Sequence, residues 1–259
     1  MLHSVTRGTG RPILVLHGAK LDHRHMLDAI EPVFEGLSGW NRVYVDLPGH
    51  GKSPTPPDLE NMAGVFQTVI DFAETNHPGQ PVALIGESRG SHVAEGIAML
   101  RPDLVAGLCL IVPGGNQPES IRPDHETLVP APGIRDRLPD AAKPRFDRLV
   151  VQSPAIAEKI VATKLPAAAL HDPDLEARIQ KAFDFSDDPQ ITGGQCEAPS
   201  LILSGRQDSI AGYDDALAML PRFPRATFAL LDTAGHSLAW ERPDLVAALI
   251  RDWLDRLAA

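Results

Sequence analysis

The chain has 259 residues, of which 43% are hydrophobic and 22% charged, the composition of an ordinary globular protein long enough to bury a large core. Its 24 basic and 34 acidic residues give a net charge of −10, which argues against nucleic acid or an anionic membrane surface as a partner. Two cysteines supply neither a disulfide framework nor a four-ligand zinc pattern. Neither a signal peptide nor an apolar run of the roughly 18 residues needed for a membrane span is found, so we expect a cytoplasmic protein.

Short apolar runs alternate with longer amphipathic stretches along much of the chain. Six runs are predicted to be strands because each is almost wholly apolar, as a parallel strand covered on both faces must be. These runs are Ile13–Leu16, Val43–Val45, Val82–Ile85, Leu108–Val112, Leu201–Leu203 and Thr227–Leu231. Helices are predicted at His25–Leu37, Asn61–Asn76, Ser91–Leu100, Tyr213–Leu220 and Pro243–Leu257. The alternation predicts an α/β fold with an open, mostly parallel sheet and helices on both faces.

Residues 113–199 interrupt this alternation. They contain no convincing strand, and proline and glycine punctuate them. Helices are predicted within them at Arg135–Val151, Pro154–Ala162 and Pro173–Phe183. Ordinary crossover helices are the alternative, but a crossover rarely needs so long a segment. We therefore interpret residues 113–199 as a helical cap inserted into a core formed by residues 1–112 and 200–259.

A candidate nucleophile lies between a predicted strand and a predicted helix. The segment Gly86-Glu87-Ser88-Arg89-Gly90 has the pattern G-x-S-x-G, which alone fits a Gly/Ser turn of an unrelated βα unit equally well. Here Val82–Ile85 runs into the first glycine and Ser91–Leu100 leaves the second, which is the setting of a nucleophile elbow. The glycines permit a tight turn, and the helix N-terminus favours negative charge developing at Ser88.

A serine nucleophile needs a base, and the base needs an acid to orient it. In the elbow architecture, the chain order is serine, acid, histidine. Asp208 follows the strand Leu201–Leu203, and His236 follows Thr227–Leu231. Both therefore lie just beyond the carboxyl end of a strand, where the active sites of open α/β sheets are built. The sequence predicts Ser88, Asp208 and His236 as a catalytic triad.

Two backbone N–H groups are predicted to form an oxyanion hole. One belongs to Arg89, directly after the nucleophile, and the other to Ala19, in the loop after the strand Ile13–Leu16. His17 and Gly18 precede Ala19 in this loop and are expected to be structural. Gly18 would permit a tight backbone, and His17 would fix the loop through hydrogen bonds.

Three side chains are candidates for substrate binding. His23 follows the oxyanion loop and could line the pocket mouth, and Trp240 is near His236 in the sequence. The side chain of Arg89 could pair with a substrate carboxylate. An ion pair between Arg89 and a nearby acid such as Glu87 is an equally good interpretation.

Five segments together resemble the α/β-hydrolase superfamily over nearly the full length of the chain. They are 16–18 (LHG), 46–53 (DLPGHGKS), 86–90 (GESRG), 205–208 (GRQD) and 234–236 (AGH). The resemblance implies an eight-stranded, mostly parallel sheet with a helical cap after strand six. Because the N-terminus is short, the first strand is expected to be missing, which leaves seven or eight strands. Arg89, Ser91 and His92 depart from the family pattern, which favours an apolar residue at the first position and small residues after the elbow.

These roles predict a serine hydrolase that works through an acyl-enzyme on a small-molecule carboxylic ester or lactone. Hydrolysis of a carbon–carbon bond in a β-diketone or ring-cleavage product is the second choice, and peptide hydrolysis is the third. A cofactor-free lyase or oxygenase, with His236 mainly a base, and a non-catalytic binding module are the rivals from other classes. We expect no metal and no cofactor, a cap that sets specificity, and a monomer or homodimer that binds neither nucleic acid nor membrane.

Overall fold

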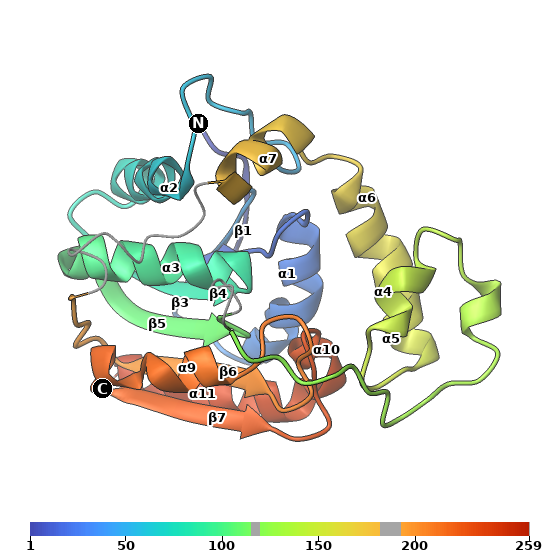
Figure 1. Ribbon diagram of the computed structural model, residues 1–259. Coiled ribbons are helices and arrows are strands. Elements are labelled where there is room, and N and C mark those ends of the chain that lie inside the picture. The colour runs from blue at the N-terminus through green and yellow to red at the C-terminus, as the bar shows by residue number, and fades with distance from the viewer. Residues whose placement is uncertain (115–119, 182–192, 259) are drawn as a thin grey trace.

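A seven-stranded sheet in the order β1-β3-β2-β4-β5-β6-β7 forms the centre of the computed structural model, which describes residues 1–114, 120–181 and 193–258 (Figure 1). The strands are β1 (Ser4–Arg7), β2 (Arg11–Leu16), β3 (Trp40–Val45), β4 (Val82–Glu87), β5 (Val105–Ile111), β6 (Ser200–Gly205) and β7 (Ala226–Leu231). Neighbouring strands are parallel, apart from the antiparallel pair of β1 and β3. The predicted α/β class and mostly parallel sheet are confirmed, with seven strands.

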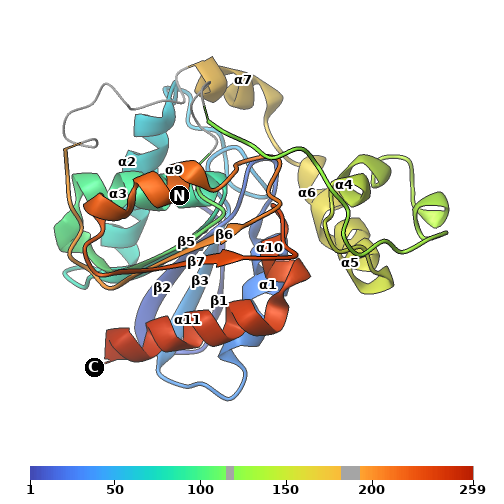
Figure 2. The ribbon, with the colours of Figure 1, turned by 60° about the horizontal axis from the view of Figure 1, so that its bottom comes forward.

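Helices cover both faces of the sheet (Figure 2): α2 (Met62–Asn76), α3 (Arg89–Leu100) and α9 (Asp214–Ala218) on one, and α1 (His23–Ile30) and α11 (Pro243–Ala258) on the other. Side chains of one strand alternate between the two cores. In β2, Leu14 and Leu16 pack on the first face, whereas Ile13 and Val15 pack on the second. This burial on both faces is why the central strands are apolar at successive positions.

The edge strand β1 is not among the six predicted strands. Its four residues pair with β3 in the register Ser4↔Val45 to Arg7↔Arg42, and its side chains are half-buried or exposed. An edge strand of this kind needs no apolar run, so the pattern that marks the other strands is missing from it.

The segment between β5 and β6 carries short helices, of which α4, α5 and α6 lie beside the sheet, whereas α7 packs on the core of the α2 and α3 face (Figures 1 and 2). They are η3 (Arg135–Arg137), α4 (Lys143–Asp147), α5 (Pro154–Lys159), the π-helical turn η4 (Ile160–Lys164), α6 (Leu165–Ala168) and α7 (Pro173–Lys181). We call residues 113–199 the insertion. Its described part contains no strand, only an isolated bridge between Val129 and Val151. A small core of its own includes Phe146, Ile156 and Trp240, the last contributed by the main body.

Prolines divide two of the predicted helices. The predicted helix His25–Leu37 is α1 followed by a 3₁₀ turn, η1 (Glu31–Phe34), with Pro32 near its start. The predicted helix Arg135–Val151 is only η3 and α4, and Pro144 lies in the first turn of α4. Proline has no N–H to donate and is accepted only in the first turn of a helix. A new helical segment therefore begins at each of these prolines, where the sequence analysis predicted one continuous helix.

The other short elements are η2 (Pro102–Leu104), η5 (Leu220–Arg222) and α10 (Leu238–Glu241). Helix α7 begins after Asp172, whose Oδ1 accepts from the backbone N–H groups of Asp174 (2.9 Å) and Leu175 (3.0 Å), as the predicted N-cap requires. The predicted end of this helix, Phe183, lies outside the described residues. None of the described helices is long and apolar enough to cross a membrane.

Trp253 joins α11 to the start of β6 and gives a test of the core. Its side chain is fully buried, and its Nε1 donates to the carbonyl of Pro199 at 2.8 Å. Replacing Trp253 with Ala should lower the free energy of unfolding by about 3–5 kcal/mol, because it leaves a large cavity. Trp253→Phe keeps most of the packing and should cost about half as much.

Urea denaturation followed by circular dichroism measures both changes. Leu245→Ala, on the same helix but 40% exposed, is the matched control and should stay within about 0.5 kcal/mol of wild type. Equal losses for Trp253→Ala and Leu245→Ala would contradict the central role of Trp253.

Candidate active site

Three side chains from different strand ends meet at the carboxyl edge of the sheet. Ser88 lies between β4 and α3, Asp208 follows β6, and His236 follows β7. His236 Nε2 is 3.0 Å from Ser88 Oγ, and its Nδ1 is 2.8 Å from Asp208 Oδ2. Because an ionised carboxylate only accepts, Nδ1 carries the imidazole proton and Nε2 can accept from the serine hydroxyl. The structure thus brings the three predicted triad residues into one hydrogen-bonded chain.

The carboxylate of Asp208 is oriented by the backbone of its own loop. Its side chain is fully buried, and its Oδ1 accepts from the N–H groups of Ile210 (2.8 Å) and Ala211 (3.0 Å). These bonds leave Oδ2 to the imidazole of His236. The acid therefore fixes the orientation of the ring from a position that water does not reach.

A buried glutamate that the sequence analysis missed holds the loop of His236. Glu241 Oε2 accepts from the N–H of Gly235 at 2.6 Å, and its Oε1 accepts from the N–H of Val150 in the insertion at 2.7 Å. Burial raises the pKa of Glu241, although these backbone donors act in the opposite direction. Glu241 thereby ties the histidine loop to the insertion.

The turn at Ser88 is strained and tightly packed. Ser88 has φ 54° and ψ −116°, a backbone conformation that residues other than glycine rarely adopt. A Cβ on Gly86 would lie 2.2 Å from the carbonyl oxygen of Gly90, and one on Gly90 would lie 2.2 Å from that of Leu16. No side chain tolerates such contacts, so both positions require glycine. Ser91 is buried, and its Oγ donates to the Gly86 carbonyl at 2.7 Å, which accounts for a hydroxyl at this family-atypical position.

The two predicted oxyanion residues adjoin Ser88. Ala19 lines the cavity that opens over Ser88. Arg89 is the first residue of α3, where N–H groups have no partner within a helix, and the first bond of this helix runs from His92 N to Ser88 O at 3.1 Å. The positions are those that an oxyanion hole requires, and the role of these N–H groups stays a prediction.

His17 holds the oxyanion loop as a neutral imidazole. Its Nδ1 donates to the carbonyl of Gly18 at 2.8 Å, and its Nε2 accepts from the N–H of Leu47 at 2.9 Å. Complete burial, reinforced by the nearby His50, lowers the pKa of His17 to about 3. The loop that carries Ala19 therefore depends on a histidine without charge.

None of the three predicted substrate-binding side chains is among the described residues that line the cavity over Ser88, and their role stays a prediction. The guanidinium of Arg89 forms an ion pair with Glu176 of α7, with 2.7 Å between Nη2 and Oε1. The predicted partner Glu87 is instead 2.8 Å from His25 Nε2. Arg89 therefore fastens the insertion to the elbow.

His23 and Trp240 have other contacts, and their predicted part in substrate binding stays a prediction. His23 Nδ1 lies 2.8 Å from Asp46 Oδ1. Trp240 is buried in the small core of the insertion, with its ring 4.6 Å from that of His25. Trp240 acts on the cavity only indirectly, through Lys164, whose Nζ lies 4.6 Å from the centre of its ring.

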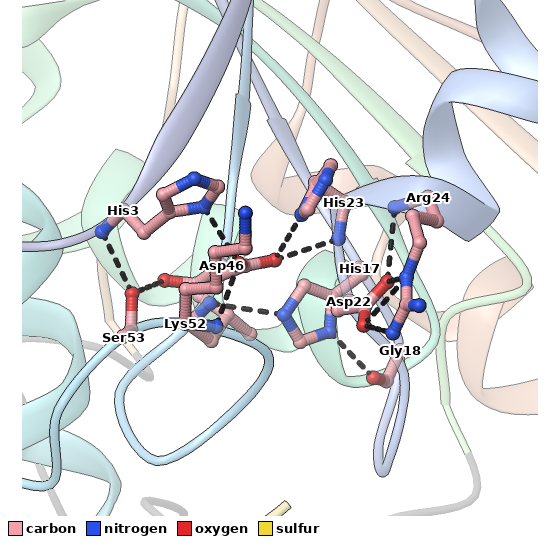
Figure 3. A network of polar contacts seen from close by, with 10 residues as sticks. His3, His17, Gly18, Asp22, His23, Arg24, Asp46, Lys52 and Ser53 are labelled. Carbon is pink, nitrogen blue, oxygen red and sulfur yellow. Dashed lines mark hydrogen bonds and ion pairs between the residues drawn. The ribbon is translucent and has the colours of Figure 1, made fainter. Parts of the chain in front are cut away.

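Asp46 is the centre of a polar network beneath the oxyanion loop (Figure 3). Its buried carboxylate accepts from the backbone N–H and Nδ1 of His23, both at 2.8 Å, from His3 Nδ1 at 2.8 Å and from Lys52 N at 3.0 Å. Burial alone would raise the pKa of Asp46, but the hydrogen bonds from His23 and Lys52 outweigh it and hold the pKa well below its usual range. His3, His23 and Asp46 are also close enough to hold a metal ion. Because these donors already occupy both oxygens, the network is better suited to anchoring the loop 46–53.

The cavity over Ser88 has a volume of about 420 Å³. The core contributes Gly18, Ala19, Lys20, Leu21, Glu87, Ser88, Ile210, His236 and Ser237, and the insertion contributes Pro144, Arg145, Arg148 and Lys164. The last three basic residues are functional candidates that the sequence analysis missed. No motif marks them, because they converge only when the insertion folds against the catalytic edge.

A sequence profile of the alpha/beta hydrolase family matches residues 13–249. The chain belongs to the alpha/beta hydrolase family. The family resemblance, the fold class and the hydrolase activity expected from the sequence are thereby confirmed. As a family member with seven strands, the protein has its insertion after β5.

Two curated relatives are hydrolases that align with most of this alpha/beta hydrolase. The 2-hydroxy-6-oxononadienedioate/2-hydroxy-6-oxononatrienedioate hydrolase of Paraburkholderia phymatum is 26% identical over 234 residues, which cover 84% of this chain and 77% of that one. The (E)-2-((N-methylformamido)methylene)succinate hydrolase of Acinetobacter baylyi is 23% identical, with 98% of this chain and 94% of that one aligned.

Solved structures share the fold. An alpha/beta superfamily hydrolase from Oenococcus oeni has a TM-score of 0.88 at 22% identity, covering 100% of this chain and 97% of that one. A thermophilic esterase from Thermogutta terrifontis has a TM-score of 0.74 at 24% identity, covering 100% and 94%. At these identities the likeness establishes the fold and leaves the substrate open.

The neutral state of His17 predicts a pH dependence of stability. The unfolded chain takes up a proton near pH 6.5, whereas folded His17 does so only near its pKa of about 3. The contribution of neutral His17 to the free energy of unfolding is therefore full above pH 6.5. It is lost as the pH falls toward 3, by at most about 1.4 kcal/mol per pH unit. His17→Gln should flatten this slope and lower stability at pH 7, because Gln cannot make both hydrogen bonds.

Urea unfolding at several pH values between 3 and 8 measures the slope. His125→Gln replaces an exposed histidine and is the matched control, which should leave the slope close to that of wild type. An unchanged slope in His17→Gln would show that folding does not lower the pKa of His17.

Proposed function

We propose that this alpha/beta hydrolase cleaves a small-molecule carboxylic ester or lactone with Ser88 as nucleophile, His236 as base and Asp208 as acid. The observation that carries the proposal is the continuous chain of hydrogen bonds from Ser88 Oγ through the imidazole of His236 to Asp208. Ser88 and His236 also line the cavity. A hydroxyl, a base and an orienting carboxylate in contact are the parts that acyl transfer requires.

In the first half of the proposed reaction, His236 Nε2 takes the proton of Ser88 as Oγ attacks the acyl carbon. Asp208 stabilises the resulting imidazolium through Nδ1. The N–H groups of Ala19 and Arg89 donate to the oxyanion, helped by the positive end of α3. As the tetrahedral intermediate collapses, His236 returns the proton to the alkoxide that leaves, and the acyl group stays on Ser88.

In the second half, a water molecule takes the place of the departed alcohol. His236 removes its proton, the hydroxide attacks the acyl carbon, and the same N–H groups hold the second oxyanion. Collapse of this intermediate frees the carboxylic acid and returns the proton to Ser88. No group beyond those of the chain and water is required.

Carbon–carbon bond hydrolysis is the second candidate, and the names of relatives favour it. Five of the curated relatives are hydrolases whose names specify dioate or succinate substrates, and four of these names specify 2-hydroxy-6-oxononadienedioate. The same base could return its proton to a carbanion in place of an alkoxide. A panel of esters beside β-diketones, with products identified by mass spectrometry, distinguishes the two.

The remaining expectations extend the proposal. We infer that residues 113–199 act as a cap that sets specificity, since Arg145, Arg148 and Lys164 reach the cavity from this insertion. We also infer a cytoplasmic monomer or homodimer that binds a small molecule, supported by the two free, buried cysteines and the acidic net charge.

Removal of the nucleophile tests the proposal directly. Ser88→Ala should lower kcat/KM for p-nitrophenyl esters by at least about 10³-fold, and Asp208→Asn by about 10⁴-fold, because the wrong imidazole tautomer is then favoured. Stopped assays of p-nitrophenol release give both numbers. Ser38→Ala, at an exposed position, is the matched serine control and should retain full activity.

A fluorophosphonate probe followed by peptide mass spectrometry identifies the nucleophile independently. The label is expected on Ser88 in wild type and in Ser38→Ala, and on no residue of Ser88→Ala. Full activity or full labelling in Ser88→Ala would overturn the proposal. Turnover by an unlabelled wild-type enzyme would favour a lyase or oxygenase that uses His236 only as a base.

A further inference from the structure

The charged side chains that line the cavity over Ser88 are mostly positive, although the whole chain has a net charge of −10. Lys20 comes from the core, and Arg145, Arg148 and Lys164 come from the insertion. Among the described residues that line the cavity, there are thus four cations and a single carboxylate, that of Glu87. A local field of this sign concentrates anions at the nucleophile.

The one carboxylate already has a partner. Both oxygens of Glu87 contact His25 Nε2, at 2.8 and 3.0 Å, and the side chain is buried. Burial acts to raise the pKa of Glu87, but the neighbouring His25 and the charge of Lys164 outweigh it and lower the pKa to about 2. Glu87 therefore remains ionised, and its oxygens are held by His25 rather than by the cavity cations.

The three cations of the insertion form no ion pair with any residue of the described chain. Arg145 Nη1 donates to the carbonyl of Ala141 at 3.3 Å, and Lys164 Nζ donates to Ser237 Oγ at 3.3 Å. Their basic neighbours along the sequence are paired, with Lys143 Nζ 2.7 Å from Asp140 and Lys159 Nζ 2.8 Å from Asp28. Arg145, Arg148 and Lys164 thus differ from Lys143 and Lys159 both in lining the cavity and in having no carboxylate within ion-pair distance among the described residues.

A π-helical turn aims Lys164 at the catalytic edge. The N–H of Leu165 donates to the carbonyl of Ile160, five residues back, and Pro166 offers no N–H to the next carbonyl. The side chain of Lys164 crosses the ring of Trp240, and its ammonium group ends beside Ser237, the residue after His236. Such turns are rare and are often found at functional sites. Burial lowers the pKa of Lys164, so an anion bound there would be a favourable partner for its charge.

Arg145 and Arg148 stand three residues apart on α4 and its C-cap, and therefore point to one side. Phe146 and Leu149, between and after them, pack into the core of the insertion and fix the helix. Arg148 adds a like charge that disfavours the charged form of Arg145, although burial is the main reason why the pKa of Arg145 is lowered. An anion between two such guanidinium groups would relieve both effects.

We propose that the cavity binds a substrate that carries a carboxylate beside its scissile ester, with Lys164, Arg145 and Arg148 as the groups that recognise it. This proposal rests on the proposed function, since the scissile bond must lie at Ser88. The carboxylate would occupy the insertion side of the cavity, and the ester carbon would lie over the nucleophile. The specificity of the hydrolase would then be set by charge at one end of the acyl chain.

Two esters of similar length test this proposal. Mono-p-nitrophenyl adipate carries the carboxylate, and p-nitrophenyl heptanoate replaces it with an alkyl end. Wild type should prefer the adipate ester by at least about 10-fold in kcat/KM. Lys164→Met, similar in length but uncharged, should lower kcat/KM for adipate by about 10- to 100-fold, mainly through KM, and change that for heptanoate by less than about 3-fold.

Arg148→Met is the second variant, because an exposed position cannot compromise folding, and it should lower the adipate preference by about 3- to 10-fold. Lys164→Arg keeps the charge and should retain most of the preference. Lys159→Met and Lys143→Met remove paired cations of the same insertion that do not line the cavity, and should leave the preference unchanged. A wild-type preference for heptanoate, or equal losses with both esters in Lys164→Met, would overturn the proposal.

Failure of the proposed function has a different signature. In that case neither ester is hydrolysed and the fluorophosphonate does not label Ser88. Titration calorimetry with free adipate still tests the carboxylate site. Binding by wild type that is weakened at least about 10-fold in both Lys164→Met and Arg148→Met supports it, whereas the same affinity in all three proteins overturns it.

Discussion

Direct contact between backbone atoms at the start of α3 and at the ends of β2 and β4 determines the geometry of the whole catalytic edge. Gly90 meets the carbonyl of Leu16, and Gly86 meets Gly90, at distances where a Cβ would overlap. The contact holds Ser88 in its strained conformation, with the hydroxyl within reach of His236. A side chain at either glycine would push α3 away from the sheet and would also move Ser88 away from His236. The strain is tolerated because buried strands on both sides fix the turn.

Much of the fold could be predicted because burial on two faces leaves a strong pattern in the sequence. The central strands have runs of apolar residues at successive positions, whereas β1 (Ser4–Arg7) is a half-exposed edge strand without such a signal. Prediction also failed where proline divides an amphipathic stretch, as at Pro32 and Pro144. There the periodicity of the side chains continues although the hydrogen bonds of the helix do not, so the pattern alone overestimates helix length.

Site residues that are placed by the direction of the strands could be predicted from the sequence. The partners of charged side chains could not. Strand ends at one edge of a parallel sheet bring Ser88, Asp208 and His236 together whatever their neighbours are. The partner of Arg89, in contrast, lies 87 residues along the chain in the insertion. Nothing local distinguishes that pairing from one with Glu87. Choices of this kind depend on how the insertion docks, which hydrophobic periodicity does not report.

The contacts that dock the insertion are next to the groups that would catalyse the reaction. Glu241 joins Val150 to the loop of His236, and Arg89, the residue after the nucleophile, binds Glu176. Movement of the insertion would therefore disturb both the base and the elbow. The proposed anion site also fits the acidic surface. Exposed charges farther than about 8 Å are largely screened at physiological ionic strength, whereas the cations of the cavity act on a bound substrate at contact. Local charge can thus select an anionic substrate although the net charge of the protein is negative.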